Sequence, residues 1–419
     1  MNPEKGDELG EPNPKGMALG LWLVAFMWVA YFLNYCDRQA VFAMFPSLRS
    51  DLKMSDEQLG LTGAIFLWVY AIGCPIAGQL GDRWSKRWMV VASLVLWSLV
   101  TVATGLSQSG TMLLSLRGAM GISESLFMPT AIALTASLSH PSRRSTAISI
   151  LTTAQIAGTV AGSWFGGWMA DQGRWREAFF ILGAIGVLYS VPYFFFLRQI
   201  PEEPSKRSSD VRESLAIGDL IRIPSYIVLC IIFPVFVFGL WLLYGWLPSF
   251  LHDKFSLNQS EAAYNATLFL QSSTAIGLIA GGWLADLLYK ITQASRMWLM
   301  VTSLVVCAPC LHFLGSSETL FATRIASMAF GLFSGLLMGN IFPAAFEVIE
   351  AKHRASAVGI LNFCGAMVSG FAALFGGLWK ASLGIDRLLT FTAIGYIAAA
   401  TVLVFGIVVF FRRDCQETS

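Results

Sequence analysis

Gly78-Gln-Leu-Gly-Asp82-Arg83-Trp-Ser-Lys86-Arg87 is a short charged segment that joins two long apolar runs, residues 56–80 and 88–107. A helix of about 20 apolar residues spans the ~30 Å hydrocarbon core of a bilayer. Similar runs recur along the chain between short polar breaks. Because lipid offers backbone groups no hydrogen-bond partners, each run must be helical. The sequence therefore predicts an all-α membrane protein.

The composition supports a membrane protein over its whole length. Of the 419 residues, 55% are hydrophobic and 13% are charged, and the mean hydropathy is +0.63, which is too apolar for one water-soluble core. We expect twelve transmembrane helices in two bundles of six. Their predicted ranges are 18–47, 56–80, 88–107, 110–138, 145–171 and 177–197, then 224–251, 260–289, 297–315, 318–349, 355–382 and 387–411.

One long hydrophilic stretch, residues 198–223, separates six spans from six. The predicted organisation is a cytoplasmic tail at 1–17, a bundle at 18–197, a cytoplasmic linker at 198–223, a bundle at 224–411 and a tail at 412–419. The tail at 1–17 lacks the basic-then-apolar order of a signal peptide. The second half also repeats features of the first: Gly282 and Asp286 match Gly78 and Asp82, and Arg324 matches Arg117. Such duplication predicts pseudo-twofold symmetry, with substrate bound between the halves.

The distribution of Lys and Arg predicts the orientation, because cytoplasmic loops collect these residues. Of the 28 Lys and Arg, eighteen fall in the predicted cytoplasmic segments and seven in the outside loops. We therefore expect a multi-pass protein of the inner (plasma) membrane with both termini in the cytoplasm.

The charged segment at 78–87 predicts a conformational latch. Glycine permits close helix approach, and an acid at a helix end among basic residues can form contacts that persist in only one conformation. The second copy has Leu287 and Leu288 where the first has its basic residues. The residues expected to act in the latch are Gly78, Asp82, Arg83, Arg87 and Asp286.

Four ionisable residues lie inside the apolar spans of the first half, where charge is costly and usually functional. Asp37 and Arg38 lie in the first span, and Arg117 and Glu124 in the fourth. Because seven residues make two helical turns, Arg117 and Glu124 share one face. Desolvation favours a protonated carboxyl, whereas a nearby guanidinium favours the charged form. We expect Asp37 and Glu124 to carry protons.

Arginine stays charged and can hold a carboxylate through two hydrogen bonds, so Arg38 and Arg117 are the expected anion ligands. The alternative is that the four charges form only structural salt bridges. Other polar side chains at interior depth predict a cavity lining suited to hydroxyls or carboxylates: Tyr35, Tyr70, Gln155, Tyr244, Gln271, Asn340 and Asn362.

These motifs resemble the major facilitator superfamily across nearly the whole chain. Asn34-Tyr35-Cys36-Asp37-Arg38, the Arg117–Glu124 spacing, Gly245-Trp246-Leu247-Pro248 and Gly359-Ile-Leu-Asn362-Phe363 are similar to the anion:cation symporter family, which includes galactonate and hexuronate carriers and relatives of sialin. The resemblance implies that acids matching Asp37 and Glu124 are protonation sites, and that arginines matching Arg38 or Arg117 assist substrate binding. The spinster family, thought to carry lysolipids, is the second resemblance.

The leading functional prediction is proton-coupled symport of a small organic anion, such as a sugar acid, by alternating access. A spinster-like lysophospholipid carrier is the alternative, and inward-facing Trp241, Trp246, Phe269 and Phe346 would favour it. Inward-facing Gln271, Asn340 and Asn362 would favour a hydroxylated acid. A non-transporting receptor or an enzyme would need an effector domain or a clustered catalytic set, and neither occurs.

The sequence predicts no bound cofactor. No G-x-x-x-x-G-K-[ST] nucleotide loop occurs, so an ion gradient should drive the protein, with sodium as the alternative to the proton. The four histidines are isolated from paired ligands, which argues against a metal. The expected partners are the anionic substrate and membrane lipids, without nucleic acid, and the expected state is a monomer.

Overall fold

The computed structural model describes residues 14–138, 144–200, 220–350 and 353–417, and these residues fold into helices without strands. The helices of the first half are α1 (Pro14–Ala43), α2 (Phe45–Asp51), α3 (Asp56–Arg83), α4 (Lys86–Gly105), α5 (Gly110–Ser125), α6 (Phe127–Leu138), α7 (Arg144–Asp171) and α8 (Trp175–Leu197). Most of the linker predicted at 198–223 lies outside the described residues.

The second half contains α10 (Pro224–Phe255), α11 (Gln259–Tyr289), α12 (Ser295–Ser316), α13 (Leu320–Glu347), α14 (Arg354–Leu383), α15 (Ile385–Gly406), the π-helical turn η3 (Ile407–Phe411) and α16 (Arg412–Glu417). The predicted tail at 412–419 therefore begins as a helix. At the other end, α1 starts at Pro14, inside the tail predicted at 1–17.

Prolines explain two breaks that the predicted spans did not include. A proline ring clashes with the carbonyl four residues earlier and ends or kinks a helix there. Pro46 lies four residues after Phe42, and α1 ends at Ala43. Pro129 lies four residues after Ser125, the last residue of α5, so the predicted span 110–138 is divided into α5 and α6.

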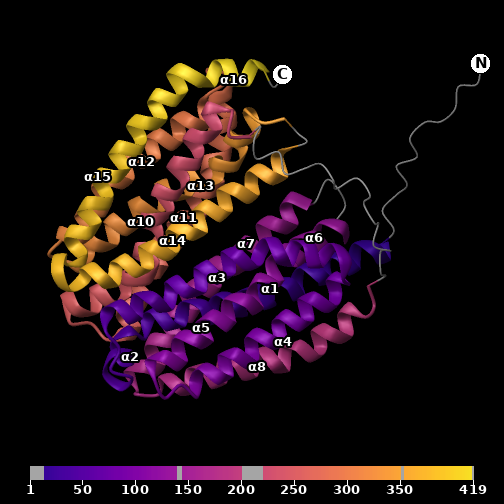
Figure 1. The fold of residues 1–419 in the computed structure, drawn as a ribbon, viewed down its shortest axis with the longest axis vertical. Helices are drawn as coiled ribbons and strands as arrows, with labels where there is room; N and C mark the ends of the chain where they lie inside the picture. The colour runs from indigo at the N-terminus through magenta and orange to yellow at the C-terminus, as the bar shows by residue number, and fades with distance from the viewer. Residues whose placement is uncertain (1–13, 139–143, 201–219, 351–352, 418–419) are drawn as a thin grey trace, which may run out of the picture.

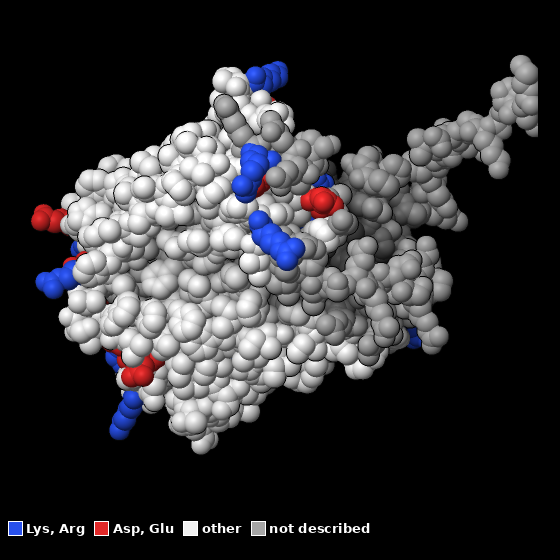
Figure 2. All heavy atoms as spheres, turned by 45° about the horizontal axis from the view of Figure 1, so that its top comes forward, with Lys and Arg blue, Asp and Glu red and all other residues white. Residues whose placement is uncertain are grey.

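Ten helices of the described chain are long and apolar enough to cross a membrane. The predicted fourth and fifth spans, which correspond to α5 with α6 and to α7, are not among them. Large apolar side chains such as Leu188, Ile279 and Phe321 are more than 70% exposed on helix surfaces. Figure 2 shows a wide uncharged surface on which Lys, Arg, Asp and Glu lie in a few small groups. Such a surface suits a hydrocarbon solvent.

The helices form two groups that follow the halves of the sequence (Figure 1). In the first half, α1 packs mainly on α7, and α4 on α8; in the second, α13 packs on α11 and α12. The two groups meet chiefly through α3 with α14 and through α7 with α11.

The halves are joined tightly at one end of the molecule, where α7 ends and α11 begins. Both carboxylate oxygens of Asp171 accept hydrogen bonds from the first turn of α11, from Gln259 N at 2.7 Å and Ser260 N at 2.9 Å. Gln259 Nε2 also donates to Ser47 Oγ at 3.0 Å, and the rings of Phe45 and Trp246 lie 5.1 Å apart. We call this region the closed end.

Glycines allow the backbones to approach at these contacts. A Cβ atom on Gly377 of α14 would lie 2.2 Å from the carbonyl oxygen of Asp56 in the other half. Gly162 of α7 has a different role: a Cβ there would lie 2.4 Å from Cys36 Cα, so this glycine packs α7 on α1 within one half.

Candidate functional site

A buried ion pair joins α1 to α5. Arg38 Nη2 donates to Glu124 Oε2 at 2.6 Å, and the same nitrogen lies 3.4 Å from Asn34 Oδ1. Arg38 is 4% exposed and Glu124 is 1% exposed. A charged pair with so little contact with water must be held by its own hydrogen bonds, and removing one partner would leave a costly buried charge.

Aromatic rings surround the Arg38 guanidinium. Its Cζ atom lies 4.6 Å from the ring centroid of Tyr35, 4.7 Å from that of Phe66 and 5.1 Å from that of Tyr70. The electron-rich ring faces attract the cation and replace part of its lost hydration. Tyr35 and Tyr70 thus lie beside Arg38.

Arg117 is fully buried but is not paired with Glu124, although their spacing predicts a shared face. Its Nε donates to the carbonyl oxygen of Thr62 at 3.4 Å, and its Nη1 lies 3.1 Å from Met120 Sδ. Within the described residues, Arg117 Nη2 and Glu124 Oε1 have no hydrogen-bond partner. Arg38, which approaches from α1, pairs only with the other oxygen of Glu124.

Asp37 faces α4. Its Oδ2 accepts a hydrogen bond from Thr101 Oγ1 at 3.1 Å, and no described residue is bonded to its Oδ1. We call Asp37, Arg38, Arg117 and Glu124 the charge cluster. It holds two acids and two bases. Nothing in the sequence singles out Thr101 or Phe66, since a hydroxyl or a ring in an apolar span is common.

The charge cluster is sealed in this conformation. The four residues are 0–4% exposed. A substrate-binding role instead predicts that they contact a chamber between the halves. Half-buried rings separate the cluster from the second half. Trp241 of α10 packs on the apolar cluster that contains Phe66 and Tyr70, and its ring centroid is 5.7 Å from that of Tyr244. We call Tyr35, Tyr70, Trp241 and Tyr244 the aromatic layer.

The other predicted lining residues divide into two kinds. Gln155 accepts a hydrogen bond from the Tyr31 hydroxyl at 3.2 Å, and the Tyr31 ring lies 5.1 Å from that of Tyr35, so Gln155 lies near the aromatic layer. Gln271 is buried on α11. Asn340 instead donates to the carbonyls of Gly281 and Leu336 and joins α13 to α11. Asn362 is exposed on α14.

The residues predicted to discriminate an acid from a lipid do not lie together. Trp246 is 0% exposed and donates to the carbonyl oxygen of Ala373 at 2.9 Å, so it seals the closed end. Phe269 and Phe346 lie beside Arg324 and Arg354. Only Trp241 joins the aromatic layer.

The predicted latch is described in part. The side chains of Gly78, Asp82 and Arg83 lie outside the described part of the structure. Arg87 Nη1 hydrogen-bonds to the carbonyls of Leu197 and Ile200 at the end of α8.

The second copy of the latch segment has no basic residue directly after Asp286, but the fold brings one from the next helix. Arg296 of α12 pairs with Asp286 at 2.8 Å and also with Glu347 of α13. One arginine therefore bridges two acids from different helices.

We expect Arg296→Gln to destabilise the second half by about 1–3 kcal/mol, because it leaves two carboxylates close together without their cation. Thermal unfolding of the purified protein in detergent measures the loss. Arg174→Gln is the control: Arg174 and Glu177 pair on the exposed surface, with half of each side chain in contact with solvent, so no measurable change is expected. Equal melting temperatures for Arg296→Gln and the wild type would contradict the assignment.

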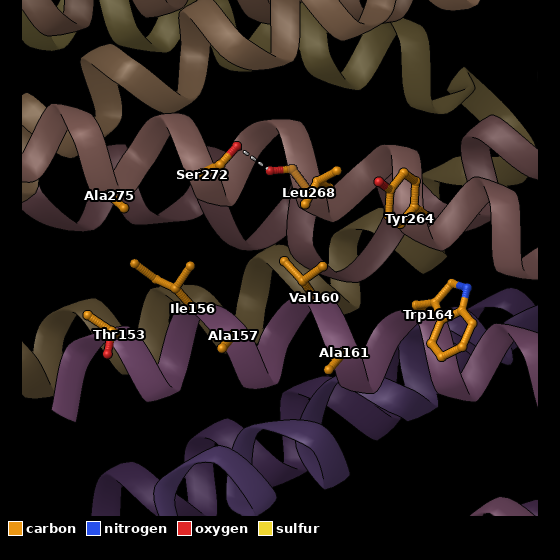
Figure 3. A pocket seen from close by; sticks show the side chains of 10 residues that line it. All are labelled: Thr153, Ile156, Ala157, Val160, Ala161, Trp164, Tyr264, Leu268, Ser272 and Ala275. Carbon is orange, nitrogen blue, oxygen red and sulfur yellow. Dashed lines mark hydrogen bonds between the residues drawn. The ribbon is translucent and has the colours of Figure 1, made fainter. Parts of the chain in front are cut away.

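A groove lies elsewhere, between α7 of the first half and α11 of the second (Figure 3). Its volume is about 480 Å³, and its lining is almost entirely apolar, with Ile156, Ala157 and Val160 on one side and Leu268 and Ala275 on the other. The hydroxyl of Ser272 is bonded to the carbonyl oxygen of Leu268, its own helix, at 2.7 Å. No charged residue of the cluster lines this groove.

An all-helical, multi-pass architecture with two joined halves and a sealed charge cluster is typical of a membrane transporter. A family model described as "Major Facilitator Superfamily" matches residues 27–373. The chain belongs to this superfamily.

Relatives of two kinds are similar to the chain. The hexuronate transporter of Bacillus subtilis (strain 168) is 27% identical over 353 residues, covering 81% of this chain and 83% of the relative. Human protein spinster homolog 1 is 28% identical over 260 residues, covering 59% of this chain and 49% of the relative. Both families named by the sequence motifs are therefore represented.

Among solved structures, a bacterial homolog of the human lysosomal transporter Spinster, in an inward-facing and unoccupied conformation, has a TM-score of 0.79 at 19% identity. The match covers 97% of this chain and 98% of that one. This likeness confirms the all-helical superfamily fold.

Proposed function

We propose that the chain is a proton-coupled symporter of a small organic anion that works by alternating access. In this proposal α5 and α6 together form one span and α7 another, which completes twelve spans in two six-helix bundles, 18–197 and 224–411, joined by the cytoplasmic linker 198–223. Both termini lie in the cytoplasm, and the protein lies in the inner membrane. The closed end then faces outward.

The observation that carries the proposal is the incomplete pairing inside the charge cluster. With all four groups ionised the cluster is neutral, yet Arg117 Nη2 and one oxygen of each acid have no partner in the described structure. Protonation of Glu124 or Asp37 gives the cluster one net positive charge in a medium of low dielectric. An anion is then attracted strongly, because charge interactions are weakly screened there.

In this proposal Arg38 couples the protonation of Glu124 to the binding of the anion. While Glu124 is ionised, Arg38 is held by it; when Glu124 takes a proton, Arg38 can turn to a substrate carboxylate with little loss of charge pairing. The aromatic layer separates Arg38 from the second half, so its rings must move for substrate to reach the guanidinium. Proton and anion therefore travel together without leaving an uncompensated charge in the membrane.

The relatives support an acid as the substrate. Besides the hexuronate transporter, the chain is 26% identical to a probable sulfoacetate transporter of Cupriavidus necator and to a probable galactarate/D-glucarate transporter of Escherichia coli. The substrates in these names are small organic acids, which fits a site built on two arginines.

A panel of sugar acids, dicarboxylates, sulfonates and lysolipids in proteoliposomes with an imposed pH gradient tests the proposal. We expect an organic acid to accumulate on the alkaline side, and accumulation to fail in Asp37→Asn and Glu124→Gln. Uptake that is unchanged by the pH gradient and by both substitutions would exclude proton symport. The same panel run with a sodium gradient at uniform pH distinguishes sodium coupling from proton coupling.

A lysophospholipid carrier of the spinster type is the second candidate. The presence of Trp241 in the aromatic layer favours it, because a large ring next to the cluster suits an acyl chain. Lysolipid transport without uptake of any acid in the panel would favour this candidate. We would then expect Trp241→Gln to reduce lysolipid transport.

A further inference from the structure

The groove between α7 and α11 continues into a second, polar pocket. Trp164 of α7 and Tyr264 of α11 line both. The polar pocket has a volume of about 410 Å³ and lies toward the closed end, where its lining includes Glu261, Asn265 and Arg324. We call the two together the amphiphilic groove, since an apolar channel leads directly to a charged pocket.

Arg324 is positioned in the polar pocket by other side chains. Its Nε donates to Asn265 Oδ1 at 2.7 Å, and Asn265 Nδ2 donates to the Glu261 carbonyl at 2.7 Å. Its Cζ atom lies 5.3 Å from the Phe269 ring centroid. No described acceptor lies within hydrogen-bond distance of its two terminal NH₂ groups. Arg324 therefore differs from its sequence counterpart Arg117: it is half-buried near a helix end, and these groups are available to a ligand.

The polar pocket presents one charge of each sign. Arg324 supplies a guanidinium, which favours phosphate oxygens, and Glu261 supplies an exposed carboxylate, which favours an ammonium. The two aromatic residues shared by both pockets are of the kind that occupies the headgroup level of a bilayer. A headgroup with a phosphate and a primary ammonium matches this set better than an anionic one.

The apolar part has the length of one lipid leaflet. Thr153 and Trp164 mark its two ends on α7, and the eleven helical steps of ~1.5 Å between them extend about 17 Å. Half of a ~30 Å hydrocarbon core is about 15 Å. Ile156, Val160 and Leu268 point into the groove from opposite sides (Figure 3), so an acyl chain there would contact both halves of the protein.

We propose that the amphiphilic groove binds one phosphatidylethanolamine molecule of the leaflet at the closed end. Its phosphate contacts Arg324, its ammonium contacts Glu261, and one acyl chain fills the space between α7 and α11. This is a resident lipid, distinct from the transported solute, and it bridges the two halves where they are joined.

Native mass spectrometry of the delipidated full-length protein, titrated with palmitoyl-oleoyl phosphatidylethanolamine, phosphatidylglycerol and phosphatidylcholine, tests this site. We expect the ethanolamine lipid to bind about tenfold tighter than the other two, which corresponds to one charge-assisted contact. Arg324→Gln should weaken it about tenfold. Glu261→Gln should weaken it and remove its advantage over phosphatidylglycerol.

Ala157→Phe fills the apolar part without changing a charge, and it should weaken binding of all three lipids. Arg174→Gln, at the same end but outside the groove, should change nothing. Size-exclusion profiles and melting temperatures identify any variant that fails to fold, in which case the remaining variants decide. Equal binding of all three lipids to the wild type, or unchanged binding in folded Arg324→Gln and Ala157→Phe, would overturn the proposal.

Discussion

Glu124→Gln is expected to abolish uphill accumulation of the anion while leaving downhill exchange intact. A pH difference of two units supplies about 2.7 kcal/mol per proton, which can drive roughly hundredfold accumulation of a co-transported monoanion. The amide still accepts a hydrogen bond from Arg38 but cannot carry a proton. The accumulation ratio should therefore fall to about one.

Uptake under an imposed gradient and counterflow at uniform pH, measured on the same proteoliposomes, separate the two activities. Glu177→Gln is the matched control, because Glu177 pairs with Arg174 on the exposed surface, far along the chain from the charge cluster. This variant should accumulate substrate as the wild type does. Full gradient-driven accumulation by Glu124→Gln would assign the proton to another group.

Gly377→Val is expected to prevent the closed end from forming. The added side chain would have to occupy space 2.2 Å from the Asp56 carbonyl oxygen, which cannot be relieved by rotating a side chain. Overpacking of this kind costs about 1–3 kcal/mol. Since 1.4 kcal/mol is a tenfold change in an equilibrium constant, the equilibrium constant for forming the closed end should fall by about 5- to 150-fold, and transport should fall with it.

Electron–electron distance measurements between spin labels at Glu57 and Ser382, both exposed at this end, report the change. The distribution should move to longer distances in Gly377→Val. Gly359→Val is the matched control on the same helix, since a Cβ there has nothing within 4 Å. An unchanged distribution in Gly377→Val would show that the closed end does not depend on this contact.

Membrane segments and charge-bearing positions are predictable from the sequence because they depend on composition alone. Asp37, Arg38, Arg117 and Glu124 stand out in apolar runs whatever their partners, and the structure places all four in the interior. The helix breaks near Pro46 and Pro129 fit the clash of a proline ring with the carbonyl four residues earlier, but proline alone does not predict a break, because Pro75, Pro234 and Pro343 lie inside continuous helices.

The pairing of these charges could not be predicted, because it depends on how helices rotate against one another. The spacing of Arg117 and Glu124 predicts a shared face of one helix but no ion-pair partner for either group, and it is Arg38 of α1 that pairs with Glu124. Likewise, Asp286 finds its partner ten residues later, on the next helix. Asn340 looks like a cavity residue by depth, yet its amide is used in packing.

The central claim is that a proton and an anion enter the charge cluster together. External pH recorded in weakly buffered proteoliposomes, with substrate added and no gradient imposed, tests it most directly. The account predicts that the medium becomes more alkaline as the wild type takes up substrate, and that Glu124→Gln exchanges substrate with no pH change. Substrate entry through the wild type without any movement of protons would contradict it.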